Sequence, residues 1–144
     1  MATYYVRKTG NDSNAGTSAG AAWLTVDKAA NTVAAGDTVY IGAGTYRELV
    51  TMDTSGSSGS IISFIGDITG TYTGDDGLVI ISAHDSDDSV ATRAIVLDFN
   101  GKNFVEWHNC TFVGSNSAFV IGNTAYATAT AYEGVVINNC TVIA

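Results

Sequence analysis

The sequence predicts an all-β protein folded as a parallel β-helix, a solenoid in which short strands stack coil upon coil. The main observation is a repeat: residues 104–112 (FVEWHNCTF) are matched 30 residues later by residues 134–142 (GVVINNCTV). In both copies apolar and polar residues alternate, as in a strand with one buried face. A unit that recurs at this spacing and alternates in this way buries its interior only against a neighbouring coil.

The alternation in each copy breaks at one asparagine, Asn109 in the first copy and Asn139 in the second. At this position two polar side chains adjoin, and the inward phase slips by one residue. Asparagine tolerates the left-handed backbone conformation that a sharp corner needs. We therefore predict a corner between two short strands at each asparagine.

Other short runs, rich in Val, Ile and Phe, are separated by clusters of Gly, Ser, Asn and Asp and are typical of strands joined by turns. They comprise residues 38–41, 61–65, 78–83, 94–99 and 118–121. The polar loops between them are not domain linkers, because each flanking strand needs the other's coil for burial. The prediction is one domain, 1–144, with an amino-terminal cap over 1–37 and stacked coils over 38–144.

One segment, at about residues 25–35, is predicted to be helical. Thr25 is a suitable N-cap and Gly36 a suitable stop. The apolar residues of this segment fall on one face: Val26, Ala29, Ala30 and Val33. Because so short a helix is marginal alone, we expect it to pack on the open first coil and cap it.

Several motifs in the first 50 residues carry a family resemblance. They are residues 4–6 (YYV), 10–18 (GNDSNAGTS), 23–25 (WLT), 28–30 (KAA), 35–41 (AGDTVYI) and 44–48 (GTYRE). Together they resemble the amino-terminal cap of right-handed β-helix proteins of the pectate-lyase-like superfamily. The resemblance implies a right-handed solenoid with an opening strand, a polar loop, a capping helix and a first coil that ends at a Gly-Thr-Tyr turn. It is specific for the fold and weak for activity, and this chain departs from relatives in having no proline.

Composition argues against several classes of partner. The net charge is -8, with 6 Lys and Arg against 14 Asp and Glu, so little positive surface is available for a phosphate backbone. No run approaches the roughly 20 apolar residues that cross a bilayer, and residues 1–5 lack the features of a secretion leader. We expect no nucleic acid partner and no membrane insertion. Phage tail spikes are released by lysis without a leader and have a similar composition, which favours an extracellular or virion-associated location.

The two cysteines, Cys110 and Cys140, occupy equivalent positions of the repeat and are expected to stack on adjacent coils. Parallel strands lie about 4.8 Å apart, which is within disulfide range by Cα distance. Side chains that run parallel make the disulfide dihedral awkward, however. The sequence therefore favours two buried thiols, with a disulfide as the alternative.

Candidate catalytic and metal-binding groups are sparse. Asp85, Asp87 and Asp88 form the densest acidic cluster, but they lack the turn glycine and the distal Glu of a calcium loop, so solvated turn charge is the simpler interpretation. Asp75 and Asp76 precede a strand and indicate a turn, and His84 is expected at the surface. We predict no catalytic residue, no metal and no cofactor.

Glu106 and His108 alternate with the buried positions of their strand and should point outward, about 7 Å apart. Asn138 should lie beside His108 on the next coil, and Arg93 and Asp98 flank the preceding strand. Such a polar row suits sugar hydroxyls and is also typical of any solvated sheet face. Tyr126 and Tyr132 bracket a loop over 123–133 and could stack on sugar rings, anchor a neighbouring subunit or clasp the coil.

The carboxyl end, residues 141–144, stops at a strand without a cap, so we expect an open or truncated end. Either the chain is the front piece, or the ordered front, of a longer β-helix, which the sequence favours, or another subunit covers its end. The predicted function is a non-catalytic structural or adhesion element of a viral tail or extracellular fibre. Its expected partners are sister subunits in a homo-oligomer and polysaccharide. The alternative is an amino-terminal fragment of a polysaccharide lyase or glycoside hydrolase.

Overall fold

The computed structural model describes residues 1–85, 95–114, 119–120 and 133–143 of the chain. Three parallel sheets make up most of this part. Sheet A joins β1 (Thr3–Val6), β2 (Thr38–Ile41), β5 (Ile62–Gly66), β8 (Val105–His108) and β11 (Val136–Asn138) in that order. Sheet B joins β3 (Gly44–Arg47), β6 (Val79–Ser82), β9 (Thr111–Val113) and β12 (Thr141–Ile143). Sheet C joins β4 (Val50–Thr51), β7 (Leu97–Asp98) and β10 (Phe119–Val120).

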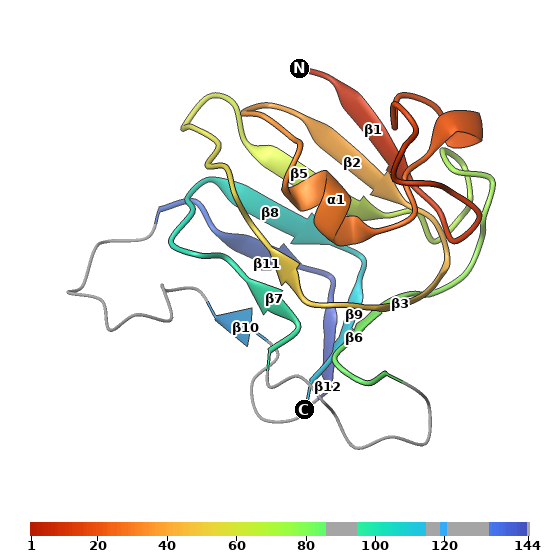
Figure 1. Ribbon diagram of the computed structural model, residues 1–144. Helices are drawn as coiled ribbons and strands as arrows, with labels where there is room; N and C mark the ends of the chain where they lie inside the picture. Colours follow the sequence, from red (N-terminus) through yellow and green to blue (C-terminus); the bar gives the residue numbers. More distant parts are fainter. Residues whose placement is uncertain (86–94, 115–118, 121–132, 144) are drawn as a thin grey trace.

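From β2 onward the chain visits sheets A, B and C in turn and then returns to sheet A beside the strand it left. Figure 1 shows the result for sheet A, whose strands lie side by side from β1 at the top of the view to β11. Every pairing between two strands is parallel. The protein is thus mostly parallel β-sheet with almost no helix, which is consistent with the predicted β-helix.

The strands of the two repeat copies pair in the register that the sequence predicts. Ile137 lies opposite Trp107 in sheet A, and Val142 lies opposite Phe112 in sheet B. Asn109 and Asn139 both adopt the left-handed conformation, with φ of 58° and 51°. Their side chains also meet, because Asn139 Nδ2 donates to Asn109 Oδ1 over 2.6 Å. The predicted corner at each asparagine is confirmed.

The core lies between the three sheets and is rich in aromatic side chains. Phe64 and Trp107 stack with centroids 4.2 Å apart, and Phe112 meets Trp107 edge-on at 5.6 Å. At the other end of sheet A, Tyr4 stacks on Trp23 at 4.7 Å. Inward side chains on neighbouring strands therefore pack upon one another, in agreement with the alternation of burial in β2, β5 and β8.

The two cysteines are free thiols, in agreement with the favoured interpretation. Cys110 is buried and Cys140 half-buried, and the Cys110 backbone N–H points to Cys140 Sγ at 3.5 Å. Burial raises the pKa of both thiols above the ordinary value, and for Cys110 the nearby Cys140 adds to the effect.

The helix is shorter than predicted. α1 spans Val26–Ala30 rather than about 25–35, although Thr25 caps it as expected by accepting a hydrogen bond from the Lys28 N–H. Beyond Ala30, Asn31 bonds to the Asp27 side chain and the Thr32 hydroxyl to the Lys28 carbonyl. A hydroxyl that bonds back to a backbone carbonyl, as that of Thr32 does, competes with helix propagation. Val26, Ala29 and Ala30 are buried. Among the described residues, neither α1 nor the 3₁₀ turn Ala19–Ala21 has the length or apolarity of a membrane-spanning helix.

The predicted Gly-Thr-Tyr turn is also wrong, because Gly44–Arg47 forms strand β3 and pairs with β6. The turn lies just before it. Gly44 has a φ of 142°, which an L side chain rarely adopts, and Tyr46 points inward, where its hydroxyl donates to the Gly42 carbonyl over 2.9 Å. The glycine therefore marks the corner, and the following residues are a strand with one buried side chain.

Candidate functional site

The outer face of sheet A carries two rows of side chains that cross all five strands. The strand register aligns Tyr5, Tyr40, Ile65, His108 and Asn138 in one row. The second row consists of Thr3, Thr38, Ser63, Glu106 and Val136. We call these ten residues the outer face. Glu106 is the only Asp, Glu, Lys or Arg among them.

Glu106 and His108 form a polar cluster at the β8 end of this face. His108 Nε2 lies 3.3 Å from Glu106 Oε2, and the two side chains are 23% and 26% exposed. The Ser63 hydroxyl, on the neighbouring strand, donates to Glu106 Oε1. Carboxylate, imidazole and hydroxyl groups are thus held together at a surface that water reaches, where they can accept and donate hydrogen bonds to a polyhydroxyl ligand.

Asn138 lies directly opposite His108 on β11, as the spacing predicts, and is exposed. Its amide extends the polar cluster by one strand. Asp98 does not join it, because β7 belongs to sheet C, and its carboxylate instead accepts a hydrogen bond from the Asn100 N–H. Arg93, Tyr126 and Tyr132 lie outside the described residues, so their predicted roles stay predictions.

His84 and the acidic cluster at Asp85, Asp87 and Asp88 are not among the ten residues of the outer face. His84 donates its backbone N–H to the Ser82 hydroxyl, and its carbonyl accepts from Arg47. Asp85 is exposed, while Asp87 and Asp88 lie outside the described residues. Within residues 1–85, 95–114 and 133–143, no three His, Cys, Asp or Glu side chains come close enough together to hold a metal ion.

Three tyrosines on the outer face, or packed on it, were missed by the sequence analysis. Tyr72, from the connection between β5 and β6, stacks on Tyr40 with centroids 3.8 Å apart and an interplanar angle of 7°. The Tyr5 ring, on the neighbouring strand β1, has its centroid 6.1 Å from that of Tyr40. Burial, together with the adjacent Tyr72 hydroxyl, raises the pKa of Tyr40 to about 12. The strand residues alternate as outward positions should, but Tyr72 belongs to a loop whose letters give no periodicity.

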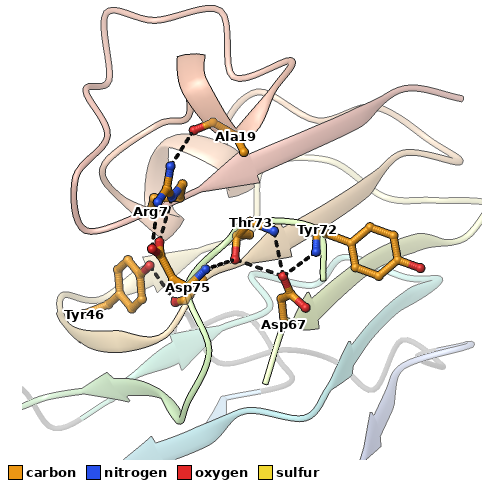
Figure 2. A network of polar contacts seen from close by, with 8 residues as sticks. Arg7, Ala19, Tyr46, Asp67, Tyr72, Thr73 and Asp75 are labelled. Carbon is orange, nitrogen blue, oxygen red and sulfur yellow. Dashed lines mark hydrogen bonds and ion pairs between the residues drawn. The ribbon is translucent and has the colours of Figure 1, made fainter. Parts of the chain in front are cut away.

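A polar network fixes the loop that carries Tyr72 (Figure 2). The Asp67 carboxylate accepts hydrogen bonds from the N–H groups of Thr71, Tyr72 and Thr73 and from the Thr73 hydroxyl, at 2.7–3.1 Å. Burial alone would raise the pKa of Asp67, but these hydrogen bonds outweigh it and lower the pKa. The Asp75 N–H donates in turn to the Thr73 hydroxyl.

Arg7 ties this loop to the amino-terminal strand. Its Nε and Nη2 each donate to one oxygen of Asp75 over 2.7 Å, and its Nη1 donates to the Ala19 carbonyl over 3.1 Å. The hydrogen bond from Arg7 lowers the pKa of Asp75, and the same bond raises the pKa of Arg7. Asp75, predicted only as a turn residue, therefore also forms a bidentate ion pair with Arg7.

Acidic side chains near α1 are likewise engaged with the backbone. Asp12 accepts from the N–H groups of Leu24 and Thr25, Asp37 from that of Ala2, and Glu48 from those of Val26 and Asp27. Burial raises the pKa of Glu48 in spite of those two hydrogen bonds. Much of the acidic excess near the amino terminus thus has a structural role, which leaves the outer face as the candidate site.

The sheets and this face define a mostly parallel β-protein with a polar and aromatic surface on one sheet. Comparison with family models places residues 8–143 in the family described as "Protein of unknown function (DUF1565)". The match covers most of the chain, and the chain belongs to this family. No match was found among curated proteins.

The fold resembles that of two solved structures at TM-scores of 0.60 or more, and a third structure matches part of the chain. A GH136 lacto-N-biosidase from Eubacterium ramulus is 14% identical, with a TM-score of 0.63, over 98% of this chain and 27% of that one. A rhamnogalacturonan lyase is 19% identical, with a TM-score of 0.60, over 99% of this chain and 51% of that one. A structure of XylC in complex with xylose is 34% identical over 56% of this chain and 12% of that one, with a TM-score of 0.48. The chain thus spans about half or less of the length of these proteins.

Proposed function

We propose that this chain is a carbohydrate-binding region of a right-handed parallel β-helix protein of the pectate-lyase-like type, with α1 as the cap of its first coil. The observation that carries the proposal is the cluster of Glu106, His108, Ser63 and Asn138 on the outer face. The Glu106 carboxylate accepts hydrogen bonds, and the Asn138 amide both donates and accepts them. Together with the His108 imidazole, these groups match sugar hydroxyls, which are donors and acceptors at once.

The similar structures support the same proposal, because they are a lacto-N-biosidase and a rhamnogalacturonan lyase and resemble this fold with TM-scores of 0.63 and 0.60. The capping role of α1 is supported by its buried face, formed by Val26, Ala29 and Ala30, and by its packing against β1 and β4. An end that exposes unpaired backbone and apolar interior requires such a cover.

The proposal is tested by measuring oligosaccharide binding to the 144-residue chain and its variants by calorimetry, after a glycan array has identified a ligand. Replacing Glu106 with glutamine keeps the shape and removes the charge, so a charge-assisted hydrogen bond becomes a neutral one. We expect affinity to fall about tenfold, since the two kinds of bond differ by about 1–1.5 kcal/mol. His108→Ala is expected to weaken binding by a similar factor.

The matched control is Asp98→Asn, which makes the same change of charge on sheet C and keeps the oxygen that accepts from the Asn100 N–H. It should bind as the wild type does. Equal losses in Glu106→Gln and Asp98→Asn would point to net charge rather than to this face. A failure of the wild-type chain to bind any glycan would contradict the proposal.

The alternative function, polysaccharide cleavage, is favoured by one local observation. His108 lies within 3.3 Å of Glu106, so an imidazole and a carboxylate are close enough to share a proton. The hydrolytic mechanisms use two carboxyl groups about 5–10 Å apart, and Glu106 is the single carboxylate among the ten residues of the outer face. The array ligand, incubated with the same sample, distinguishes the two functions, because cleavage yields unsaturated or reducing ends.

Presentation of this face on a viral tail or extracellular fibre, as a homo-oligomer, stays a proposal that the sequence composition alone supports. Light scattering of the purified chain measures the subunit number directly. A mass above that of one 14.9 kDa chain is expected for a fibre element. A strictly monomeric, folded chain would contradict the oligomeric arrangement.

A further inference from the structure

Tyr72 presents an aromatic ring whose two faces have different surroundings. One face lies flat on Tyr40, with 3.8 Å between the ring centroids. The residue is nevertheless 51% exposed, so the other part of the ring faces solvent. Among the described residues, no other aromatic side chain is as exposed. A large apolar ring held flat against a sheet and open to water is a surface on which a planar or chair-shaped ring can stack.

The loop that carries Tyr72 is rigid, because its backbone is bonded at several successive residues. The N–H of Tyr72 itself donates to Asp67 Oδ2 over 2.8 Å, and the N–H of Thr73 donates to the same oxygen over 2.7 Å. The Arg7–Asp75 pair fixes the end of the loop. Figure 2 shows the Tyr72 ring projecting away from this network. A ring positioned in advance loses little conformational entropy when a ligand stacks on it.

The ring is continuous with the polar cluster along one row of the outer face. Tyr40, under Tyr72, is followed in register by Ile65 and then by His108. Neighbouring strands lie about 4.8 Å apart, so Tyr40 and His108 are about 10 Å apart across the sheet. A ligand that contacts both ends is longer than a monosaccharide. This geometry fits an oligosaccharide that crosses β2, β5 and β8.

The charge of the face indicates which sugars it accepts. Glu106 is its only Asp, Glu, Lys or Arg residue, and the whole chain carries a net charge of -8. Arg7, the nearest cation in the network, is already paired with both oxygens of Asp75. A uronate chain would bring carboxylates to a face whose ten residues include no Lys or Arg, at a cost in repulsion and desolvation. A neutral sugar has no such cost.

We propose that Tyr72 is a stacking subsite for a neutral sugar ring, and that it forms one continuous site with the Glu106–His108 cluster for a neutral oligosaccharide. This inference rests on the proposed function and adds to it a second subsite and a class of ligand. The C–H groups on one side of a neutral pyranose would lie on the electron-rich face of Tyr72.

The test compares Tyr72→Ala with Tyr72→Phe by calorimetry. The probes are gluco-, xylo-, manno- and galacto-hexaoses and, as the charged counterpart, hexagalacturonate. Loss of the ring in Tyr72→Ala should weaken binding of the neutral probe roughly 2- to 12-fold, the value of an aromatic contact. Tyr72→Phe keeps the ring and should bind within about twofold of the wild type. Leu78→Ala removes an exposed apolar side chain outside sheet A and is the matched control, with no change expected.

The outcomes separate the two proposals. If Glu106→Gln weakens binding of the neutral probe and Tyr72→Ala leaves it unchanged, the stacking subsite is overturned and the proposed function stays in place. Binding of hexagalacturonate in preference to every neutral probe would overturn the ligand class. Failure to bind any of the probes or any array glycan would overturn both. Thermal unfolding of each variant, followed by circular dichroism, shows that Tyr72→Ala is folded before its affinity is compared.

Discussion

Replacing Trp107 with alanine is expected to destabilise the protein by about 3–5 kcal/mol, the usual cost of deleting a large buried aromatic side chain. Trp107 is fully buried, stacks on Phe64 and meets Phe112 edge-on. Its removal therefore takes away a packing partner of both rings. A domain of this size is stable by about 5–15 kcal/mol, so the loss is a large fraction of the total. Urea unfolding followed by circular dichroism measures it.

Trp107→Phe is the informative control. The Trp107 Nε1 is buried and is the single side-chain N or O atom of the described residues that is buried without a hydrogen-bond partner. Phenylalanine therefore gives up volume but no hydrogen bond, and it keeps a ring against Phe64. We expect it to cost clearly less than alanine. In contrast, Trp23 Nε1 donates to the Asn14 carbonyl over 2.9 Å, so Trp23→Phe also loses a bond. A Trp107→Phe variant as unstable as Trp107→Ala would show that the indole has a partner.

The second large effect is expected on acidification, through Asp67 and Asp75. Both carboxylates have a lowered pKa in the folded protein, Asp67 because its hydrogen bonds outweigh its burial, and Asp75 because of Arg7. A carboxylate whose folded pKa lies below the unfolded value of about 3.9 stabilises the fold fully above that value. This contribution is lost as the pH falls below about 4 and through the two folded pKa values. The free energy of unfolding, measured between pH 7 and pH 2, should decrease in that window.

Substitutions at Asp67 and Asp75 test whether these two carboxylates cause the loss of stability in acid. Asp67→Ala leaves three backbone N–H groups without their acceptor, of which that of Thr73 is buried, and since a buried unpaired N–H costs about 1–3 kcal/mol, we expect a destabilisation of that size at pH 7. Asp75→Asn removes the charge that faces Arg7 and should flatten the acid limb of the curve. Asp76→Asn, an exposed neighbour, is the control and should behave as the wild type. An unchanged acid limb in Asp75→Asn would rule out the Arg7 pair as its origin.

The sequence predicted those features that repeat or alternate. The two copies around Asn109 and Asn139 predicted the register of β8 with β11 and of β9 with β12, together with the left-handed corners. Alternation along 104–112 also placed Glu106 and His108 on the outward side and Asn138 beside them. These inferences succeed because strand side chains alternate with a period of two, and because neighbouring coils must align their apolar positions.

Features that depend on contacts between non-repeating segments could not be predicted in this way. Arg7 and Asp75 are 68 residues apart, and neither belongs to a periodic run. Tyr72 lies in a loop and joins the outer face only because Asp67 folds that loop back over Tyr40. The end of α1 was misplaced because apolar spacing continued to Val33, while the Thr32 hydroxyl bonded back to the Lys28 carbonyl.

The buried thiols have a consequence for the surroundings in which this fold persists. Cys110 and Cys140 pack coil upon coil without a covalent bond, and burial keeps both in the protonated form that is a poor nucleophile. Oxidants and disulfide-exchanging reagents act on the deprotonated sulfur. The segments that carry the two cysteines are therefore held together by the parallel pairings of β8 with β11 and of β9 with β12 and by side-chain packing, and their association does not depend on a disulfide.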